Sequence, residues 1–336
     1  MNSVFKGLNQ DHKVFVASII KADAAALQKY VESGMDFSKP LNDLSQSAIF
    51  FAVMSNRLPI VKFVVNAGGN VNAVDVNGLT PAHAACELGN AAILRLLCDE
   101  GAVLTVRDNQ SRTAVTVAFT MGKRDVIDVI MSTGLDIMNP TDKSAFTPLI
   151  AVSTVGNIEL VRWLLEQKAD VNYLIDKGSA LHYAAMHNRL VVVKELLANK
   201  ADPHVGDFQG TTPLHHALGY GNVSAAELIC AAGGSLTKAN DKGDTPIEYA
   251  MAHCSLTSAR FVIKQNNNNI NATDHFGSTL LHYAAFKNKL DVAQWLVEQG
   301  IDVKIRNKKG ETAFDKAVQV GSVEVMDYLA PLEDAA

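Results

Sequence analysis

The sequence predicts an all-α solenoid in which short helix pairs stack on one another and are joined by β-hairpin-like connectors. The first observation is that a segment of about 33 residues recurs ten times in the 336-residue chain. The second is that each copy holds two apolar segments separated by turn-forming residues. Because one such pair is too small to bury its own apolar face, neighbouring pairs must stack. The copies start near residues 13, 47, 80, 113, 147, 179, 212, 245, 279 and 312.

The first apolar segment of each copy predicts a short helix. Its pattern is clearest in TPAHAACELGN (80–90), TPLHHALGYGN (212–222) and TLLHYAAFKNK (279–289). The opening Thr can cap the helix, and Pro is tolerated in its first turn. A Gly-Asn-like break follows about nine residues later, so the segment ends there.

The second segment predicts a longer apolar helix, as in IELVRWLLEQ (158–167) and LDVAQWLVEQ (290–299). Trp163 and Trp295 share one position in this helix, and we expect both in the core. A residue suited to the left-handed conformation should end the helix. These residues are Gly34, Gly68, Gly101, Gly134, Gly233 and Gly300, with Asn266 in the eighth copy.

The connectors carry Asp and Gly at hairpin spacing, as in DVNG (75–78), DFQG (207–210) and DHFG (274–277). Three copies depart from the pattern. The fourth reads TAVTVA (113–118) and lacks the Pro and the His. The connector at 176–178 is one residue short, and NNNN at 266–269 indicates a one-residue insertion. We expect such copies to change the stacking locally.

This combination of a 33-residue period, TPLHxA, a Gly-Asn-type break, a long second helix and DxxG connectors resembles the ankyrin repeat. The resemblance covers the chain from residue 13 to its end. It implies antiparallel helix pairs with hairpins projecting at one edge of a curved solenoid. We therefore expect a lead-in at 1–12 and a single repeat domain at 13–336.

Composition excludes several classes of function. Apolar residues make up 48% of the chain, which is ample for a core, and the formal charge of -5 argues against nucleic-acid binding. No apolar run reaches the roughly 18 residues of a membrane span. The four cysteines lack CxxC spacing, which fits a reducing compartment. We expect a monomer in the cytoplasm, with a nuclear location also open.

The sequence shows no motif that would indicate an enzyme. It has no GxSxG, HExxH, P-loop, GxGxxG or paired Cys ligands. We therefore expect no catalytic residue, no cofactor and no metal. Four histidines occupy the same position, three residues after the Thr or Ser: His83, His182, His215 and His282. Because an active site is needed only once, this recurrence indicates structural histidines that bond within the turn and to the next copy.

A stripe of Tyr and His follows four consecutive first helices on the side away from the core. It occupies the fourth and eighth positions after the Thr or Ser. Because these two positions are four residues apart, they are neighbours on one side of the helix. Its members are Tyr183, His187, His216, Tyr220, Tyr249, His253 and Tyr283, with Lys287 completing the last pair. Stacked helices lie about 8–10 Å apart, so these histidines cannot share one metal ion. Two interpretations stay open: packing between copies, or a recognition surface.

The ankyrin resemblance implies further partner contacts from connector tips and from the ends of first helices. The site residues that it adds are Leu79, Leu88, Met121, Phe146, Phe208, Phe276 and Phe286. The predicted function is a scaffold or adaptor that binds a partner protein or peptide in a concave groove. One alternative is a regulatory or substrate-recruiting subunit, such as a ubiquitin-ligase receptor or an inhibitor that masks its target. Another is a small-molecule binder or enzyme with a hidden pocket.

Overall fold

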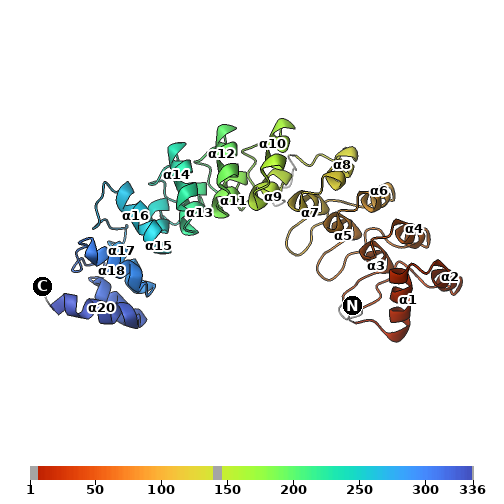
Figure 1. Ribbon diagram of the computed structural model, residues 1–336, viewed down its shortest axis with the longest axis horizontal. Coiled ribbons are helices and arrows are strands. Elements are labelled where there is room, and N and C mark those ends of the chain that lie inside the picture. Colours follow the sequence, from red (N-terminus) through yellow and green to blue (C-terminus); the bar gives the residue numbers. More distant parts are fainter. Residues whose placement is uncertain (1–6, 139–145, 335–336) are drawn as a thin grey trace. The chain divides into compact units, whose positions relative to one another are not determined.

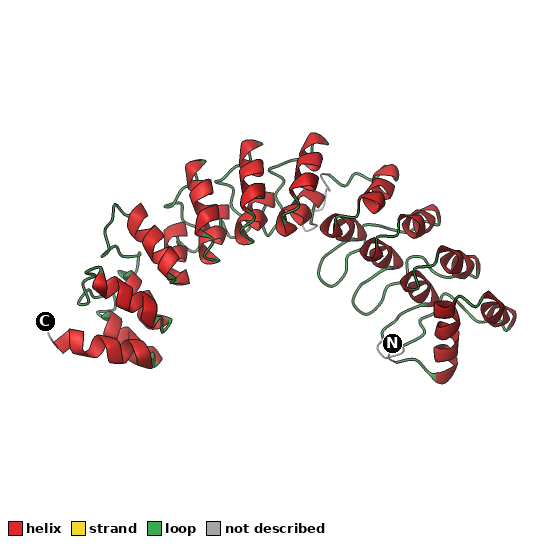
Figure 2. Cartoon of the chain, viewed as in Figure 1, coloured by secondary structure: helices red, strands yellow, loops and turns green. Residues whose placement is uncertain are grey.

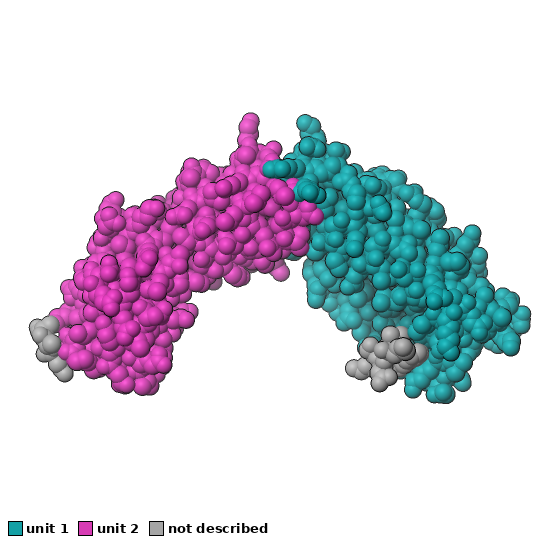
Figure 3. Space-filling view, in the orientation of Figure 1, with its two compact units in different colours: residues 1–152, 159–170 teal, residues 153–158, 171–336 magenta. Residues whose placement is uncertain are grey.

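The computed structural model describes residues 7–138 and 146–334, and their regular structure is helical, as predicted (Figures 1 and 2). The chain forms two compact units (Figure 3). Unit 1 comprises residues 1–152 and 159–170, and unit 2 comprises residues 153–158 and 171–336. Part of the predicted lead-in, residues 1–6, lies outside the described residues.

Each copy contributes two helices, so the helices alternate along the chain. The first helices are α1 (Gln10–Lys21), α3 (Ala48–Met54), α5 (Pro81–Leu88), α7 (Ala114–Met121), α9 (Pro148–Val155), α11 (Ala180–Met186), α13 (Pro213–Gly219), α15 (Pro246–His253), α17 (Leu280–Phe286) and α19 (Ala313–Val320). The second helices are α2 (Ala24–Glu32), α4 (Leu58–Asn66), α6 (Ala91–Asp99), α8 (Arg124–Ser132), α10 (Ile158–Glu166), α12 (Leu190–Ala198), α14 (Val223–Ala231), α16 (Leu256–Gln265), α18 (Leu290–Glu298) and α20 (Val323–Asp334).

From the second copy on, the first helices begin at the predicted Thr or Ser, whereas α1 begins at Gln10 after the cap Asn9, inside the predicted lead-in. The Thr80 hydroxyl accepts the backbone N–H of His83, and Pro81 occupies the first position of α5. Because an uncapped first turn leaves backbone N–H groups without partners, this bond stabilises the helix start. Alanine and leucine then fill the buried side, and in α5 the side chains of Ala82, Ala85 and Cys86 are at most 1% exposed.

The second helices end as predicted at left-handed glycines, such as Gly68 with φ +90° and Gly300 with φ +87°. In the fifth and sixth copies, Lys168 and Lys200 adopt this conformation instead. The prediction for Asn266 was wrong, because its φ is -96°. Asn267 and Asn268 are left-handed in its place, and two consecutive left-handed residues accommodate the extra residue of this copy.

The two tryptophans are also placed differently from the prediction. Both are only half-buried. Arg124 lies over the ring of Trp163, with 4.3 Å between the guanidinium carbon and the ring centroid, and Arg260 lies over Trp295 at 5.3 Å. Each ring therefore takes part in a cation–π contact from the preceding second helix, and Trp163 also packs at the edge of the core against the buried Phe119, with ring centroids 6.3 Å apart.

The connectors are closed by an Asp or Asn side chain. In the connector at 75–79, the Asp75 Oδ1 atom accepts the backbone N–H groups of Asn77 at 2.8 Å and Leu79 at 2.9 Å. Gly78 completes the turn with φ +79°. Neighbouring connectors also bond to each other, as when Lys308 donates its backbone N–H to the carbonyl of Phe276 at 2.8 Å. These bonds form a ladder along the connectors.

The ladder changes between the eighth and ninth copies. There the backbone N–H of His275 donates to the Glu248 carboxylate at 2.8 Å instead of to the preceding connector. Gly243, at the tip of that connector, has no described atom within 4 Å of the position a Cβ would take. At the equivalent Gly78, a Cβ would lie 2.8 Å from the Asp108 backbone. The connector of the eighth copy is therefore not stacked on the next.

This difference predicts unequal costs for two equivalent substitutions. Gly78→Ala and Gly243→Ala both force alanine into a left-handed conformation, at about 1–2 kcal/mol each. Only Gly78→Ala should also push the neighbouring connector away, which adds about 1–3 kcal/mol. Urea unfolding followed by circular dichroism should show the larger loss for Gly78→Ala. Equal losses at the two positions would contradict the unstacked connector.

Candidate interaction surface

The four recurrent histidines link neighbouring copies, as predicted. In the sixth copy, the His182 Nδ1 atom accepts the backbone N–H of Ser179 at 3.0 Å. Nε2 must then carry the ring proton, and it donates to the carbonyl of Thr211 in the next copy at 3.0 Å. His83, His215 and His282 repeat this arrangement with the carbonyls of Arg112, Asp244 and Glu311.

Burial keeps these imidazoles neutral. It lowers the pKa of His182 to about 3, and it also lowers the pKa values of His83, His215 and His282. A neutral ring that both accepts and donates a backbone hydrogen bond is fully occupied by its structural role. The prediction that these histidines are structural is therefore confirmed.

The stripe residues at the fourth position bond to their own connector. His216 Nε2 lies 3.2 Å from a carboxylate oxygen of Asp207, and the Tyr283 hydroxyl donates to Asp274 at 2.8 Å. Tyr249 likewise accepts from the Asn240 side-chain amide at 3.2 Å. These bonds hold each connector against its first helix.

The same rings also pack on the preceding copy. The His216 ring lies edge-on to His182 with centroids 5.6 Å apart, and the Tyr249 ring lies edge-on to His215 at 5.1 Å. Tyr183 is only 7% exposed. Of the two interpretations of the stripe, these contacts support packing between copies for the fourth-position residues. Their contribution to partner binding stays a prediction.

The eighth-position residues of the stripe are exposed. Tyr220 follows α13 and is 60% exposed, and His187 follows α11 and is also exposed. His253 ends α15, where its ring lies so close to Gly221 that a side chain at that glycine would overlap it. This part of the stripe is available to a partner.

Four aromatic side chains of unit 2 form what we call the aromatic surface: Phe208, Tyr220, Phe276 and Phe286. Their exposed fractions are 64%, 60%, 57% and 49%. Phe208 and Phe276 lie at connector tips, and Tyr220 and Phe286 lie at the C-terminal ends of α13 and α17. Among the described residues, these are the aromatic members of the exposed large apolar side chains. The seventh and ninth copies thus each carry one exposed ring at the connector tip and one at the end of the first helix.

The remaining predicted contact residues lie in unit 1. Met121 ends α7 and is 45% exposed. Leu79, Leu88 and Phe146 are half-buried. This unit therefore presents less exposed apolar surface at the predicted positions than unit 2 does.

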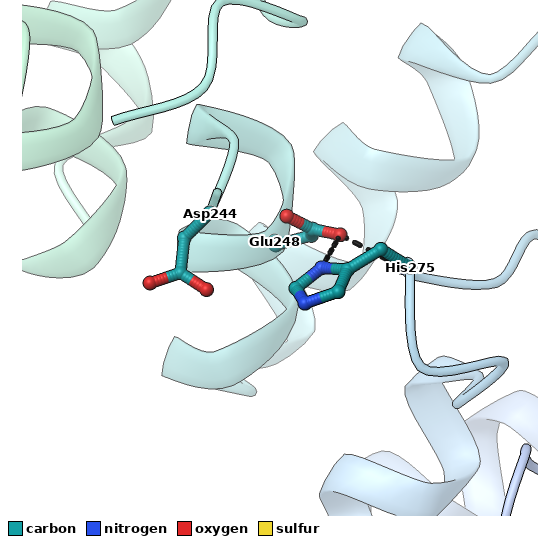
Figure 4. A group of neighbouring side chains, drawn as sticks. All are labelled: Asp244, Glu248 and His275. Atoms are coloured by element: carbon teal, nitrogen blue, oxygen red, sulfur yellow. Dashed lines mark hydrogen bonds and ion pairs between the residues drawn. The ribbon is translucent and has the colours of Figure 1, made fainter. Parts of the chain in front are cut away.

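One cluster has the residue types of a metal site. Ligand atoms of Asp244, Glu248 and His275 all lie within 4.8 Å of one another (Figure 4). One Glu248 oxygen accepts hydrogen bonds from the Thr245 backbone N–H at 2.7 Å and from the Thr245 hydroxyl at 2.9 Å. The other oxygen accepts a hydrogen bond from the His275 backbone N–H at 2.8 Å and lies 2.7 Å from the His275 ring atom Nδ1. Both Glu248 oxygens therefore already accept hydrogen bonds within the fold.

Glu248 is a residue whose role sequence reasoning missed. It occupies the position of the four structural histidines, and that exception was the available signal. Burial opposes its charged form, but the backbone N–H groups of Thr245 and His275 outweigh this effect and lower the pKa of Glu248. The charged carboxylate therefore replaces the imidazole as the link to the next copy.

Among the described residues, no helix combines the length and the apolarity that crossing a membrane requires.

Comparison with known proteins gives a family match. A family model described as ankyrin repeats (3 copies) matches residues 49–141, 138–207, 181–274 and 255–335. The B-cell lymphoma 3 protein homolog of Mus musculus is 33% identical over 178 residues, which are 52% of this chain and 40% of that protein. The probable 26S proteasome regulatory subunit p28 of Saccharomyces cerevisiae is 26% identical over 205 residues, which are 59% of this chain and 90% of that protein.

Two solved structures share the architecture. The human ASB11 ankyrin repeat domain superposes with a TM-score of 0.51 at 25% identity, covering 61% of this chain and 91% of that domain. The ankyrin repeat domain of Bcl-3 gives a TM-score of 0.52 at 27% identity, covering 64% of this chain and 96% of that domain. The helix pairs and connectors of this chain therefore share their fold with ankyrin repeat domains of solved structure.

Proposed function

Because this chain belongs to the ankyrin-repeat family, we propose that it is an interaction protein that binds a partner protein or peptide through the aromatic surface of unit 2. The observation that carries the proposal is the exposure of Phe208, Tyr220, Phe276 and Phe286. Aromatic rings are enriched at interface hot spots because each buries a large area at a small entropy cost. Four such rings, at the connector tips and at the ends of the first helices of two copies, support a binding surface.

The surroundings of these rings support preformed binding. Bonds between connectors fix Phe208 and Phe276: the backbone N–H of Phe208 donates to the Asp176 carbonyl, and Lys308 donates to the carbonyl of Phe276. The hydrogen bond from the Tyr283 hydroxyl to Asp274 attaches the connector at 274–278 to helix α17. A surface that is already ordered loses little conformational entropy on binding, so a modest contact area can give useful affinity.

The proposal predicts that truncating the rings removes partner binding while the fold persists. In a pull-down, the triple variant Phe208→Ala/Tyr220→Ala/Phe276→Ala should capture at least about tenfold less of any specific partner. The matched control is Val191→Ala, because Val191 is 59% exposed but lies on the second helix α12. The fold of each variant is checked by circular dichroism. A folded triple variant that retains every partner would show that the aromatic surface is not the binding site.

A second candidate is a regulatory subunit of a larger assembly. It is favoured by the similarity to the yeast protein named as a probable proteasome regulatory subunit, of which this chain covers 90%. A subunit of this kind should co-elute with a stoichiometric set of other chains when purified gently from its source cells. Elution of the native protein with one partner alone would favour the simple scaffold instead.

A further inference from the structure

A pocket of about 310 Å³ lies in unit 2 at the part of the aromatic surface formed by Phe276 and Phe286. The connector at 274–278 and helix α17 form one side of it, and residues 307–311 with helix α19 form the other. Its volume is near the lower end of the range of about 300–1,000 Å³ typical of ligand pockets. The pocket is therefore large enough for one or two side chains of a bound segment.

The pocket has apolar walls that are held in place. Phe276 and Phe286 line it, and both rings are about half exposed. Asp274 also lines it, but one of its oxygens accepts the backbone N–H groups of Phe276 and Ser278 at 2.8 and 2.7 Å. The other oxygen accepts the Tyr283 hydroxyl. The Asp274 carboxylate is thus buried and engaged within the fold, so it offers little negative charge to a ligand.

The rim of the pocket is basic. Lys308, Lys309 and Lys316 line it, and the amines of Lys287 and Lys316 lie 5.8 and 5.7 Å from the centroid of the Phe286 ring. The Lys316 amine forms a long ion pair with the Glu311 carboxylate, at 3.9 Å between Nζ and Oε2. In the part of the chain that the structure describes, Lys287, Lys308 and Lys309 have no ion-pair partner.

This basic rim contrasts with the rest of the protein. The formal charge of the whole chain is -5. Lysine amines without partners beside exposed rings favour a ligand that is apolar at its centre and anionic at its flanks. A nucleic acid is disfavoured, because its backbone needs a basic stripe along an extended surface.

We propose that this pocket binds a short acidic peptide segment, with one apolar side chain between Phe276 and Phe286 and flanking carboxylates on Lys308, Lys309 and Lys316. The inference rests on the proposed function, because it names the chemistry of the partner segment. Burial of the peptide's apolar side chain between the two rings stabilises the complex. The peptide's carboxylates are attracted to the lysine amines, and their hydrogen bonds orient the peptide in the pocket. Because Lys308 and Lys309 are exposed, binding weakens as the salt concentration rises.

The test uses the purified full chain and labelled heptapeptides with fluorescence anisotropy. The first peptide has a central Phe flanked by three acidic residues on each side. The second has Ala at the centre, and the third has lysine flanks. We expect saturable binding of the first peptide, at least about fivefold weaker binding of the second, and no binding of the third.

Two charge-reversal variants separate the pocket from general electrostatics. Lys308→Glu/Lys309→Glu should weaken binding of the first peptide at least about tenfold. Lys242→Glu changes an exposed lysine in the unstacked connector of the eighth copy and should change binding less than about twofold. Equal effects of these variants, or no saturable binding by the unchanged protein, would overturn the inference. So would tighter binding of a single-stranded oligonucleotide than of the first peptide.

The peptide assay and the pull-down fail independently. If the peptides do not bind but the triple aromatic variant loses its partners, the acidic-peptide inference is wrong and the proposed function stands. If the triple variant keeps every partner, the proposed function is wrong whatever the peptides do.

Discussion

His182→Ala is expected to lower the free energy of unfolding by about 3–5 kcal/mol. The substitution removes the acceptor of the Ser179 N–H and the donor to the Thr211 carbonyl, and both groups are buried. It also opens a cavity where a fully buried ring stood. Urea unfolding measures the loss, and hydrogen exchange shows whether the amides of the sixth and seventh copies open first, as a chain of nearest-neighbour contacts requires.

His187→Ala is the matched control for this substitution. His187 follows the same helix, α11, but its side chain is exposed. Its replacement should change the free energy of unfolding by less than about 0.5 kcal/mol. If both alanine variants lose similar stability, His182 does not link the two copies.

Acidification from pH 7 to pH 5 is expected to destabilise the protein by about 2 kcal/mol through His182 alone. The pKa of His182 is about 3 in the folded chain, against an ordinary value of 6.5. Because the folded pKa is the lower one, the unfolded chain binds more protons below pH 6.5. The stabilisation is therefore complete above pH 6.5 and is lost progressively as the pH falls toward 3.

Burial also lowers the pKa values of His83, His215 and His282. Acidification therefore lowers the free energy of unfolding through these three histidines as well. The carboxylates with lowered pKa values, such as Glu248, lose their contribution only below about pH 4.5. The interval from pH 7 to pH 5 thus isolates the histidines.

His182→Gln provides the control for the acid effect, since glutamine has both an acceptor and a donor but does not titrate. Urea midpoints of the wild type and this variant are compared at pH 7, 6 and 5. The difference between the two proteins should shrink as the pH falls, because only in the wild type does residue 182 bind a proton on unfolding at low pH. A constant difference would contradict the neutral state of His182.

Much of the fold was predictable because its signals are local. The Thr80 cap, the connector Asp75 and the left-handed Gly68 each act within a few residues, and each recurs at the same period. The role of the recurrent histidines followed from recurrence alone. Asn266 was wrongly placed because an insertion can be absorbed at several neighbouring positions, and only the packed chain selects Asn267 and Asn268.

The candidate site was less predictable. Helical spacing placed Tyr183, His216 and Tyr249 on one side of their helices, but it did not show that His216 and Tyr249 pack on the histidine of the preceding copy, or that Tyr183 is buried. The segment RNKKGETAFDK at 306–316 contains three lysines beside the pocket, and spacing alone did not connect them to Phe276 and Phe286.

By itself, the sequence determined the repeat period, the helix pairs, their caps and the position of the structural histidines, because these depend on short-range hydrogen bonding and apolar periodicity. The tertiary structure alone decided which stripe residues are exposed, where the connector ladder changes at Glu248, and that a basic rim surrounds an apolar pocket. The reason is physical: exposure and pocket shape depend on how one copy stacks on the next, and that contact joins residues about 30 positions apart.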